Sequence, residues 1–296
     1  MPVRIPSKLP ATQVLKSENI FVMTEECAKS KNIRQIRMLI LNLMPTKIVT
    51  ETQLSRMLSV PDLEVDIELL KMATHTSKNA PLEHMNTFYK TFDEVKDNSY
   101  DGMIITGAPV ELLEFEDVTY WDELCTIMDW AISNVKSTLY ICWGAQAGLY
   151  HHYGIQKFAL DKKAFGIFEH KILEPKLQLF HGFDNEFFAP HSRHTEICGD
   201  DIKKVSELDL LSTSEEVGVY ALKSSDNRQF FITGHPEYDT ETLAFEYFRD
   251  VKKGLEIDIP KNYFLSDNPE NPPLFTWQKH AQLLYANWLN YYVSQG

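Results

Sequence analysis

Strand-like apolar runs alternate with helix-like patterns along the first half of the chain, and this alternation constrains the fold more than any other feature. The run at 36–44 is continuous, which is typical of a strand buried on both faces of a sheet, and the segment 100–109 reads as another buried strand that ends in a Gly-Ala-Pro turn. Two more lie at 63–72, which begins with strict apolar/polar alternation, and at 137–142. The helical patterns lie at 50–59, 118–135 and 144–154. Strands that alternate with helices predict right-handed crossovers and a parallel sheet covered on both faces.

The pattern changes from about residue 160. Short apolar or alternating segments at 165–172, 218–225 and 228–235 follow one another without long helices between them, which predicts an antiparallel extension of the sheet. Helical patterns return at 240–253 and 274–293. We therefore expect a flavodoxin-like α/β fold, with a central, mostly parallel sheet, helices on both faces and an antiparallel extension.

The two ends of the chain differ in character. Residues 1–33 contain Pro2, Pro6 and Pro10 and predict an irregular arm that packs over the domain or over a partner subunit. The proline-rich segment 266–273 reads as a connector inside a domain. We therefore expect residues 34–296 to form a single α/β domain.

Charge and hydropathy exclude two classes of partner. The chain carries 29 basic and 42 acidic residues, a net charge of −13, and no basic tract of five or more residues, so we expect no nucleic-acid partner. No apolar run reaches the roughly 18 residues that span a bilayer. The N-terminus lacks the apolar segment of a signal peptide. We therefore expect a cytoplasmic protein whose four cysteines are reduced thiols.

One cysteine, Cys142, lies where a predicted strand meets a predicted helix. Such a turn exposes the side chain, places the thiol at a helix N-terminus that favours thiolate, and leaves backbone N–H groups beside it. The small residues that so tight a turn needs follow directly in the sequence, at Gly144, Ala145, Ala147 and Gly148. The alternative for a lone thiol is an inert, packed cysteine.

A second strand end carries complementary chemistry. The apolar run "FFIT" is followed by Gly234, His235, Pro236 and Glu237. Pro236 favours an extended conformation at His235, and in an extended chain residues i and i+2 point the same way. His235 can therefore accept the proton of the Cys142 thiol while Glu237 orients its imidazole. The alternative is a surface histidine beside a solvated glutamate.

A third strand ends in "TGAP", at 106–109. Backbone N–H groups of this turn, with Ala108 as the candidate donor, could join that of Trp143 to form an oxyanion hole. An ordinary strand-to-loop turn explains the same residues equally well.

The elbow "ICWGAQ" with a later His-Pro-Glu resembles the class I glutamine amidotransferase fold. Those domains usually have a glycine two residues before the cysteine, where this chain has Tyr140, and usually feed ammonia to a synthetase domain, which this sequence lacks. Glutamine hydrolysis stays as an alternative function.

Longer motifs along nearly the whole chain resemble a more specific family, the homoserine O-acyltransferases of the succinyl/acetyl type, from methionine biosynthesis. The motifs are "PSKLPATQVLKSENIFVMT", "ILNLMPTKIVTETQLSR", "TGAPVELLEFEDVTYW", "CWGAQAGLYHHYGI", "FAPHSRHTEI" and "GHPEYD". The resemblance implies transfer of an acyl group from coenzyme A to the hydroxyl of L-homoserine by a ping-pong route.

The resemblance also implies roles for single residues. Cys142 would carry the acyl thioester, His235 would be the general base, and Glu237 would orient His235. The homoserine site of the family maps onto Lys163, Ser192 and Arg249, and the planar fork of an arginine suits an amino-acid carboxylate. For a lysine or arginine considered alone, a solvated surface position is the usual alternative.

The acyl donor is predicted from one position of the "TGAP" loop, where the resemblance associates glycine with succinyl and glutamate with acetyl. This chain has Glu111. A second carboxylate would repel the free carboxylate of a succinyl group, at a cost of about 4 kcal/mol for charges ~4 Å apart at an effective dielectric of 20. We therefore expect acetyl-CoA as donor and O-acetyl-L-homoserine as product, with succinyl-CoA as the alternative. Glu111 could instead face solvent within an acidic run.

The remaining predictions concern ligands and assembly. We expect no bound cofactor, since acetyl-CoA is a substrate, although its phosphates need a locally positive pocket in so acidic a chain. The pairs His151–His152 and His191/His194 have no carboxylate or cysteine at ligand spacing in the sequence, so we expect no metal. Family members support a homodimer.

Overall fold

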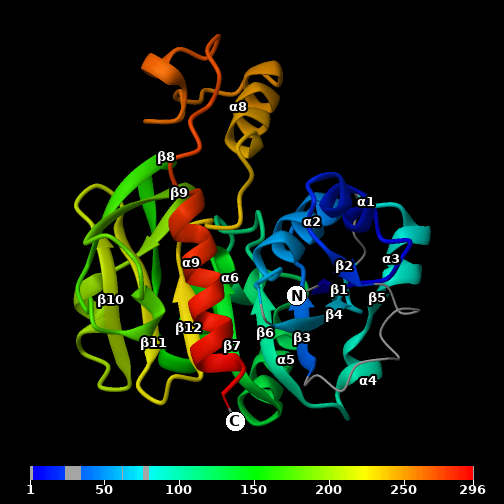
Figure 1. Ribbon diagram of the computed structural model, residues 1–296. Helices are drawn as coiled ribbons and strands as arrows, with labels where there is room; N and C mark the ends of the chain where they lie inside the picture. The colour runs from blue at the N-terminus through cyan, green and yellow to red at the C-terminus, as the bar shows by residue number, and fades with distance from the viewer. Residues whose placement is uncertain (1–2, 24–34, 62, 76–79, 296) are drawn as a thin grey trace.

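The computed structural model describes residues 3–23, 35–61, 63–75 and 80–295 (Figure 1). Its centre is a twelve-stranded sheet with the order β2-β1-β4-β3-β6-β7-β12-β11-β10-β8-β9, in which β5 pairs with β4. The strands of the N-terminal half are β3 (Gln35–Leu41), β4 (Glu64–Leu70), β5 (Tyr89–Lys90), β6 (Tyr100–Ile105) and β7 (Val135–Ile141). All of these pair in parallel, which confirms the predicted parallel sheet.

Helices cover both faces of this sheet. α1 (Pro10–Ser17), α2 (Lys47–Met57) and α9 (Gln278–Trp288), with the π-helical turn Leu289–Val293, contribute to the hydrophobic cluster on one face. α5 (Trp121–Asn134) and α6 (Trp143–Tyr153) contribute to the cluster on the other face. The short helices α3 (Leu82–Phe88) and α4 (Phe92–Val95) lie in the connection from β4 to β6.

The second half of the chain forms the antiparallel part of the sheet. It contains β8 (Lys157–Ile172), β9 (Glu186–Ile197), α7 (Gly199–Ile202), β10 (Leu208–Ser214), β11 (Gly218–Ser224) and β12 (Gln229–Ile232). β8 pairs with β9 and β10, and β11 pairs with β10 and β12, all antiparallel. α8 (Thr242–Lys252) and the segment after it stand out beyond the end of the sheet (Figure 1).

Two expectations need correction. The segment 228–235, expected in the antiparallel extension, has one parallel neighbour, because β12 pairs in parallel with β7. The arm expected to be irregular contains β1 (Val3–Arg4), which pairs with β4 and β2 (Val22–Met23), and also α1. The arm is regularly folded because its apolar side chains are buried and complete the hydrophobic core at this edge of the sheet. Residues 24–33 of the arm lie outside the described residues, and the division at residue 33 stays a prediction.

No helix among the residues that the structure describes is long and apolar enough to cross a membrane.

Candidate active site

Cys142 lies at a strained corner between β7 and α6. Its backbone has φ 52° and ψ −117°, an arrangement that costs a side-chain-bearing residue about 1–3 kcal/mol and that the surrounding structure must hold in place. The Cys142 N–H donates to the Ile232 carbonyl at 2.7 Å, which fixes the corner to β12. A Cβ on Gly144 would lie 2.6 Å from the Thr106 carbonyl oxygen, so glycine is required there. The predicted strand-cysteine-helix turn is confirmed.

His235 follows β12, the strand next to β7, after which Cys142 comes. Its backbone N–H donates to the Pro190 carbonyl at 2.8 Å, and its Nδ1 lies 2.8 Å from Glu237 Oε1. The tyrosine ring of Tyr238 stacks on the imidazole, with centroids 4.1 Å apart and planes at 16°. His235 and Glu237 are both buried. The predicted pairing of residues i and i+2 therefore exists in the structure, and the alternative of a surface histidine is wrong.

The pKa of His235 is shifted by its surroundings. Burial acts to lower it, but the charges of Cys142 and Glu237 and hydrogen bonds to both side chains raise the pKa well above its usual value. A thiol that contacts an imidazole, itself oriented by a carboxylate, is an arrangement of nucleophile, base and orienting group. The geometry is therefore suited to nucleophilic chemistry at sulfur.

The "TGAP" turn packs directly against this pair. A Cβ on Gly107 would lie 3.2 Å from Cys142 Cβ and 3.4 Å from His235 Cε1, so the turn needs a small residue. Trp143 is the first residue of α6, and its N–H therefore has no acceptor within the helix. Ala108 lines the same cavity as Cys142. One candidate oxyanion donor thus directly follows Cys142 and the other lines the same cavity, and their role stays a prediction.

A cavity of about 1080 Å³ opens above Cys142 and His235. It lies at the C-terminal ends of the parallel strands, where ligands bind in open α/β sheets, and residues of α8 line one side of it. The predicted residues that line it are Cys142, His235, Ala108, Glu111, Lys163, Ser192 and Arg249. Glu237 lies behind His235, and the Trp143 side chain is buried in the core. The fold thus gathers the predicted site residues around one cavity.

Strand β9 explains why Ser192 reaches the cavity. Side chains alternate along a strand, and His191, Arg193 and Thr195 point into the interior, where they are buried. Ser192 and His194, the residues between them, line the cavity. The sequence pattern of β9 therefore selects which polar groups a ligand meets.

Sequence reasoning missed Glu246, a residue of the cavity wall that contacts three other polar side chains. Its carboxylate accepts hydrogen bonds from Ser192 Oγ and, at 3.0 Å, from Tyr238 Oη, and lies 3.4 Å from Lys163 Nζ. Glu246 precedes Arg249 by three positions on α8, so both face the same side. This i, i+3 spacing from Arg249 is the sequence signal that could have identified Glu246 as a site residue. Arg249 itself forms a two-bond ion pair with Asp250, at 2.7 and 2.8 Å.

Glu111 lines the cavity rather than facing solvent as one residue of an acidic run. Its Oε1 accepts the backbone N–H of His194 at 3.1 Å. Burial raises the pKa of Glu111, while the hydrogen bond from His194 and the positive charges of His194, His235 and Lys163 oppose this shift. The alternative position for Glu111 in the sequence analysis is therefore wrong.

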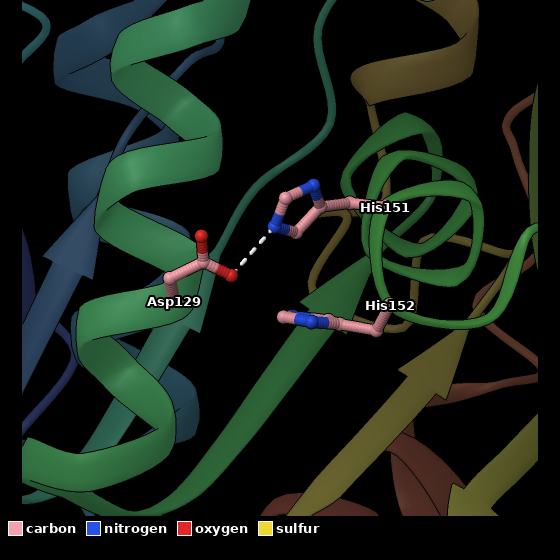
Figure 2. Close-up of side chains that lie close together, drawn as sticks. All are labelled: Asp129, His151 and His152. Carbon is pink, nitrogen blue, oxygen red and sulfur yellow. Dashed lines mark hydrogen bonds and ion pairs between the residues drawn. The ribbon is translucent and has the colours of Figure 1, made fainter.

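The histidine pair His151–His152 does have a carboxylate neighbour, which the sequence analysis did not find. Asp129 lies on α5, which β7 separates from α6 in the chain, and its Oδ1 is 2.7 Å from His151 Nε2 (Figure 2). One ligand atom of each of the three residues lies within 4.8 Å of the others. Burial lowers the pKa of His152 to about 4, helped by the neighbouring His151. That no metal binds stays a prediction.

Tyr140 marks the departure from the amidotransferase pattern, and it fills the space under α6. Its ring stacks on Phe231 with centroids 4.8 Å apart. A Cβ on Gly148 would lie 2.8 Å from the Tyr140 ring. The large side chain of Tyr140, two positions before the cysteine, therefore needs a glycine at position 148 of the helix that packs on it.

Solved structures with the same fold define the class. A glutamine amidotransferase from Thermotoga maritima superimposes with a TM-score of 0.55 at 12% identity, covering 89% of this chain and 100% of that chain. One from Methylobacillus flagellatus has a TM-score of 0.55 at 12% identity, covering 90% and 98%. The protein therefore has the class I glutamine amidotransferase-like fold, as the sequence predicted.

Sequence comparisons identify the family within this class. The profile described as homoserine O-succinyltransferase matches residues 2–296. Relatives named homoserine O-acetyltransferase include those of Acetivibrio thermocellus, 60% identical, and Bacteroides fragilis, 58% identical, each over 100% of this chain and 97% of the relative. The chain belongs to the homoserine O-succinyltransferase family, whose members are acyltransferases. The predicted family is confirmed.

Proposed function

We propose that this protein is a homoserine O-acetyltransferase, which transfers acetyl from acetyl-CoA to the hydroxyl of L-homoserine. The observation that carries this proposal is that one cavity holds the Cys142–His235 pair together with Glu111 and a wall of groups suited to an amino acid. The names of the relatives, at 55–60% identity, support it. The product would enter methionine biosynthesis. A cytoplasmic homodimer belongs to the same proposal.

In the first half-reaction, Cys142 Sγ loses its proton to His235 and attacks the acetyl carbonyl carbon of acetyl-CoA. The oxyanion that forms lies near the N–H groups of Trp143 and Ala108. The bond from the carbonyl carbon to the coenzyme A sulfur then breaks, and His235 returns the proton to that sulfur. Cys142 now carries acetyl as a thioester. Glu237 stays ionised and stabilises the protonated His235.

In the second half-reaction, His235 accepts the proton of the homoserine hydroxyl, whose oxygen attacks the thioester carbon. The bond to Cys142 Sγ breaks, and the proton goes back from His235 to the sulfur. One pair of groups therefore performs both halves, because each half needs proton removal from a nucleophile and proton return to a sulfur.

The cavity wall supplies both charges that recognise an amino acid. Arg249 uses two of its five N–H donors on Asp250, which leaves donors for the homoserine carboxylate. Glu246 is a carboxylate on the cavity wall and suits the ammonium group of homoserine. Ser192 and Lys163 both contact Oε2 of Glu246. Recognition of this substrate thus rests on side chains from β8, β9 and α8.

Glu111 supports acetyl as the acyl group. Its carboxylate is held in the cavity by the His194 N–H, so a succinyl carboxylate entering the same cavity would meet a like charge. A repulsion of about 4 kcal/mol at ~4 Å and an effective dielectric of 20 far exceeds the 1.4 kcal/mol that corresponds to a tenfold preference. Succinyl-CoA is the competing donor.

The test is an intact-mass measurement after incubation with acetyl-CoA in the absence of homoserine. We expect a single acetyl adduct in the wild type and none in Cys142→Ala, and release of the adduct when homoserine is added. Turnover without an adduct would overturn the covalent route. A higher kcat/KM for succinyl-CoA than for acetyl-CoA would overturn the assignment of the donor, and hydrolysis of glutamine at a comparable rate would overturn the assignment of the reaction.

A further inference from the structure

A second cavity, of about 400 Å³, lies at the C-terminal edge of the sheet next to the proposed active site. Asn42 and Leu43, which follow β3, and Lys71 and Met72, which follow β4, line it, and Tyr120 at the start of α5 closes one side. One loop separates the two cavities. Its residues Met44, Pro45 and Thr46 line the active-site cavity, while Asn42, Leu43 and Lys47 line the second.

The charge of this second cavity is opposite to that of the active-site cavity. Its described lining residues include Lys47, Lys71 and His75 and no aspartate or glutamate. The wall of the active-site cavity carries five carboxylates, those of Glu111, Asp239, Glu241, Glu246 and Asp250. A cationic cavity in a chain of net charge −13 is a favourable place for an anion.

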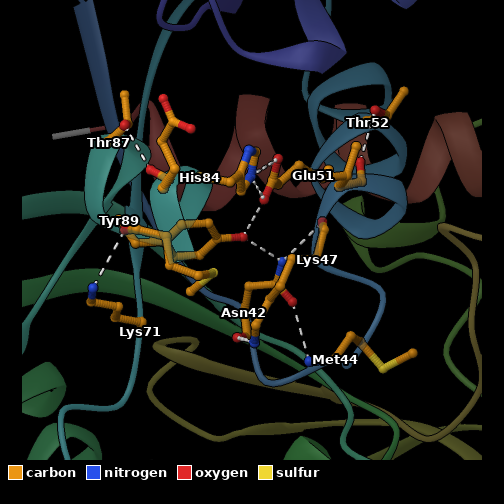
Figure 3. Close-up of polar contacts among 12 residues, drawn as sticks. Asn42, Met44, Lys47, Glu51, Thr52, Lys71, His84, Thr87 and Tyr89 are labelled. Carbon is orange, nitrogen blue, oxygen red and sulfur yellow. Dashed lines mark hydrogen bonds and ion pairs between the residues drawn. The ribbon is translucent and has the colours of Figure 1, made fainter. Parts of the chain in front are cut away.

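The two lysines donate their hydrogen bonds to neutral oxygens (Figure 3). Lys71 Nζ donates over long distances, 3.4 Å to the Met85 carbonyl and 3.3 Å to Asn86 Oδ1. Lys47 Nζ donates to the Asn42 carbonyl, and burial lowers its pKa to about 8 against the opposing charge of Glu51.

The carboxylate of Glu51, four positions after Lys47 on α2, is already held by other side chains. It accepts from His84 Nε2 at 2.9 Å and from Tyr89 Oη at 2.5 Å (Figure 3). The carboxylate of Glu123 is likewise engaged by the backbone N–H groups of Ala73 and Thr74, at 2.8 and 2.9 Å. The charges of Glu51 and Glu94 act on Lys47 and Lys71, respectively, but among the described residues neither lysine has a carboxylate at ion-pair distance. An anion in the cavity would therefore supply the direct counter-charge that both lysines lack.

The separation of the two cavities matches a ligand with a reactive end and a distant charged end. The strand order runs β7, β6, β3, β4, so three strand spacings separate Cys142 from Lys71. At about 4.8 Å per spacing this is roughly 14 Å along the sheet edge. Acetyl-CoA carries its thioester at one end of an extended pantetheine arm and its phosphates and adenine at the other.

The cavity also offers an aromatic surface. The rings of His75 and Tyr120 meet edge to face, with centroids 5.3 Å apart, and both residues line the cavity. Stacking on such rings suits an adenine base, since a purine presents a flat π-face.

We propose that this second cavity binds the phosphorylated adenosine end of acyl-CoA, with Lys71 as the principal phosphate contact and His75 and Tyr120 against the base. The pantetheine arm passes over the 42–47 loop to bring the thioester to Cys142. The proposal rests on the proposed acyl-CoA chemistry, and it explains how so acidic a protein holds so anionic a substrate.

The experiment compares two donors, acetyl-CoA and S-acetylpantetheine, which lacks the nucleotide. We expect Lys71→Ala to lower kcat/KM for acetyl-CoA about 10- to 100-fold, mainly through KM, because a charge-assisted phosphate contact is lost. With S-acetylpantetheine, Lys71→Ala and the wild type should be equal. Lys71→Arg should recover part of the loss, and Lys203→Ala, at an exposed lysine directly after α7, should leave kcat/KM unchanged for both donors.

Equal loss with both donors, or no loss with either, would overturn the proposed nucleotide site. Equilibrium binding of adenosine 3′,5′-bisphosphate gives an independent measurement. Its affinity should fall in Lys71→Ala and in Tyr120→Ala but not in Cys142→Ala. Unchanged affinity in the first two variants would also overturn the proposed nucleotide site. Formation of the acetyl adduct on wild-type Cys142 from S-acetylpantetheine would show that the proposed function holds even if the nucleotide site is overturned. Absence of that adduct in the wild type contradicts the function itself.

Discussion

Ile141 and Ile232 are partners in register on the neighbouring parallel strands β7 and β12. The two halves of the proposed active site follow directly from these two residues, since Cys142 comes one position after the first and His235 three positions after the second. The backbone N–H of Cys142 also donates to the Ile232 carbonyl. The contact between thiol and imidazole is therefore set by strand pairing, and it does not depend on a mobile loop.

Removal of the orienting carboxylate should change how stability depends on pH. In the folded protein the pKa of His235 lies well above its usual value, so protonated His235 stabilises the fold. That contribution is fully present below about pH 6.5, the unfolded value, and is lost as the pH rises through the folded value. In Glu237→Gln the contribution is smaller. We expect the difference in unfolding free energy between wild type and Glu237→Gln to be largest at acidic pH and to shrink at alkaline pH.

Urea unfolding from about pH 5.5 to about pH 9.5 measures this difference. A difference that is constant over this range would contradict the assigned coupling. In the same variant kcat should fall about 10²- to 10⁴-fold, because the imidazole loses its orienting partner. Glu256→Gln, a change at an exposed glutamate beyond α8, serves as the control.

Replacement of Glu111 by glycine should change the preferred acyl donor. The substitution removes the carboxylate that the His194 N–H holds in the cavity and leaves room there. We expect the ratio of kcat/KM for succinyl-CoA to that for acetyl-CoA to rise by at least about tenfold, which corresponds to 1.4 kcal/mol. Glu114→Gly, in the same loop and exposed, should leave the ratio unchanged. An unchanged ratio in Glu111→Gly would show that the donor is selected elsewhere.

Glu246→Gln should separate the two half-reactions. The substitution removes the charge proposed to receive the homoserine ammonium, so KM for homoserine should rise about 10- to 100-fold. Formation of the acetyl adduct on Cys142, which needs no homoserine, should proceed at the wild-type rate. The adduct is followed by intact mass and the second half by release with homoserine. Slow adduct formation with a normal KM for homoserine would contradict this role.

Sequence patterns predicted the parts of the fold and site that depend on local chemistry. Apolar segments identified β3 and β6, and the small residues after Cys142 identified its turn. They could not show that the His-Pro-Glu strand lies beside the cysteine strand in parallel, because strand neighbours are set by long-range packing. The same limit explains the ordered strands of residues 3–23, which look irregular until they are paired with β4.

The predicted substrate residues show a different limit. Lys163, Ser192 and Arg249 came from family resemblance, since spacing alone does not single out Lys163 and Arg249 among the 29 basic residues. Glu246 escaped because a glutamate on an amphipathic helix usually faces solvent. Only the position of α8 over the cavity gives it three partners, Ser192, Tyr238 and Lys163.

A methyl group at Gly144 should destabilise the elbow far more than the same change at Gly154. A Cβ at Gly144 would lie 2.6 Å from the Thr106 carbonyl oxygen and 2.8 Å from that of Ile105, and backbone atoms of a central strand cannot move away cheaply. Gly154, which ends α6 with φ +70°, has open space around it, so alanine there costs only about 1–2 kcal/mol of backbone strain. We expect Gly144→Ala to lower the unfolding free energy by about 3 kcal/mol or more. Urea unfolding of both variants provides the measurement. Equal losses would mean that α6 can shift away from β6, and that the strained geometry at Cys142 is not fixed by this close contact.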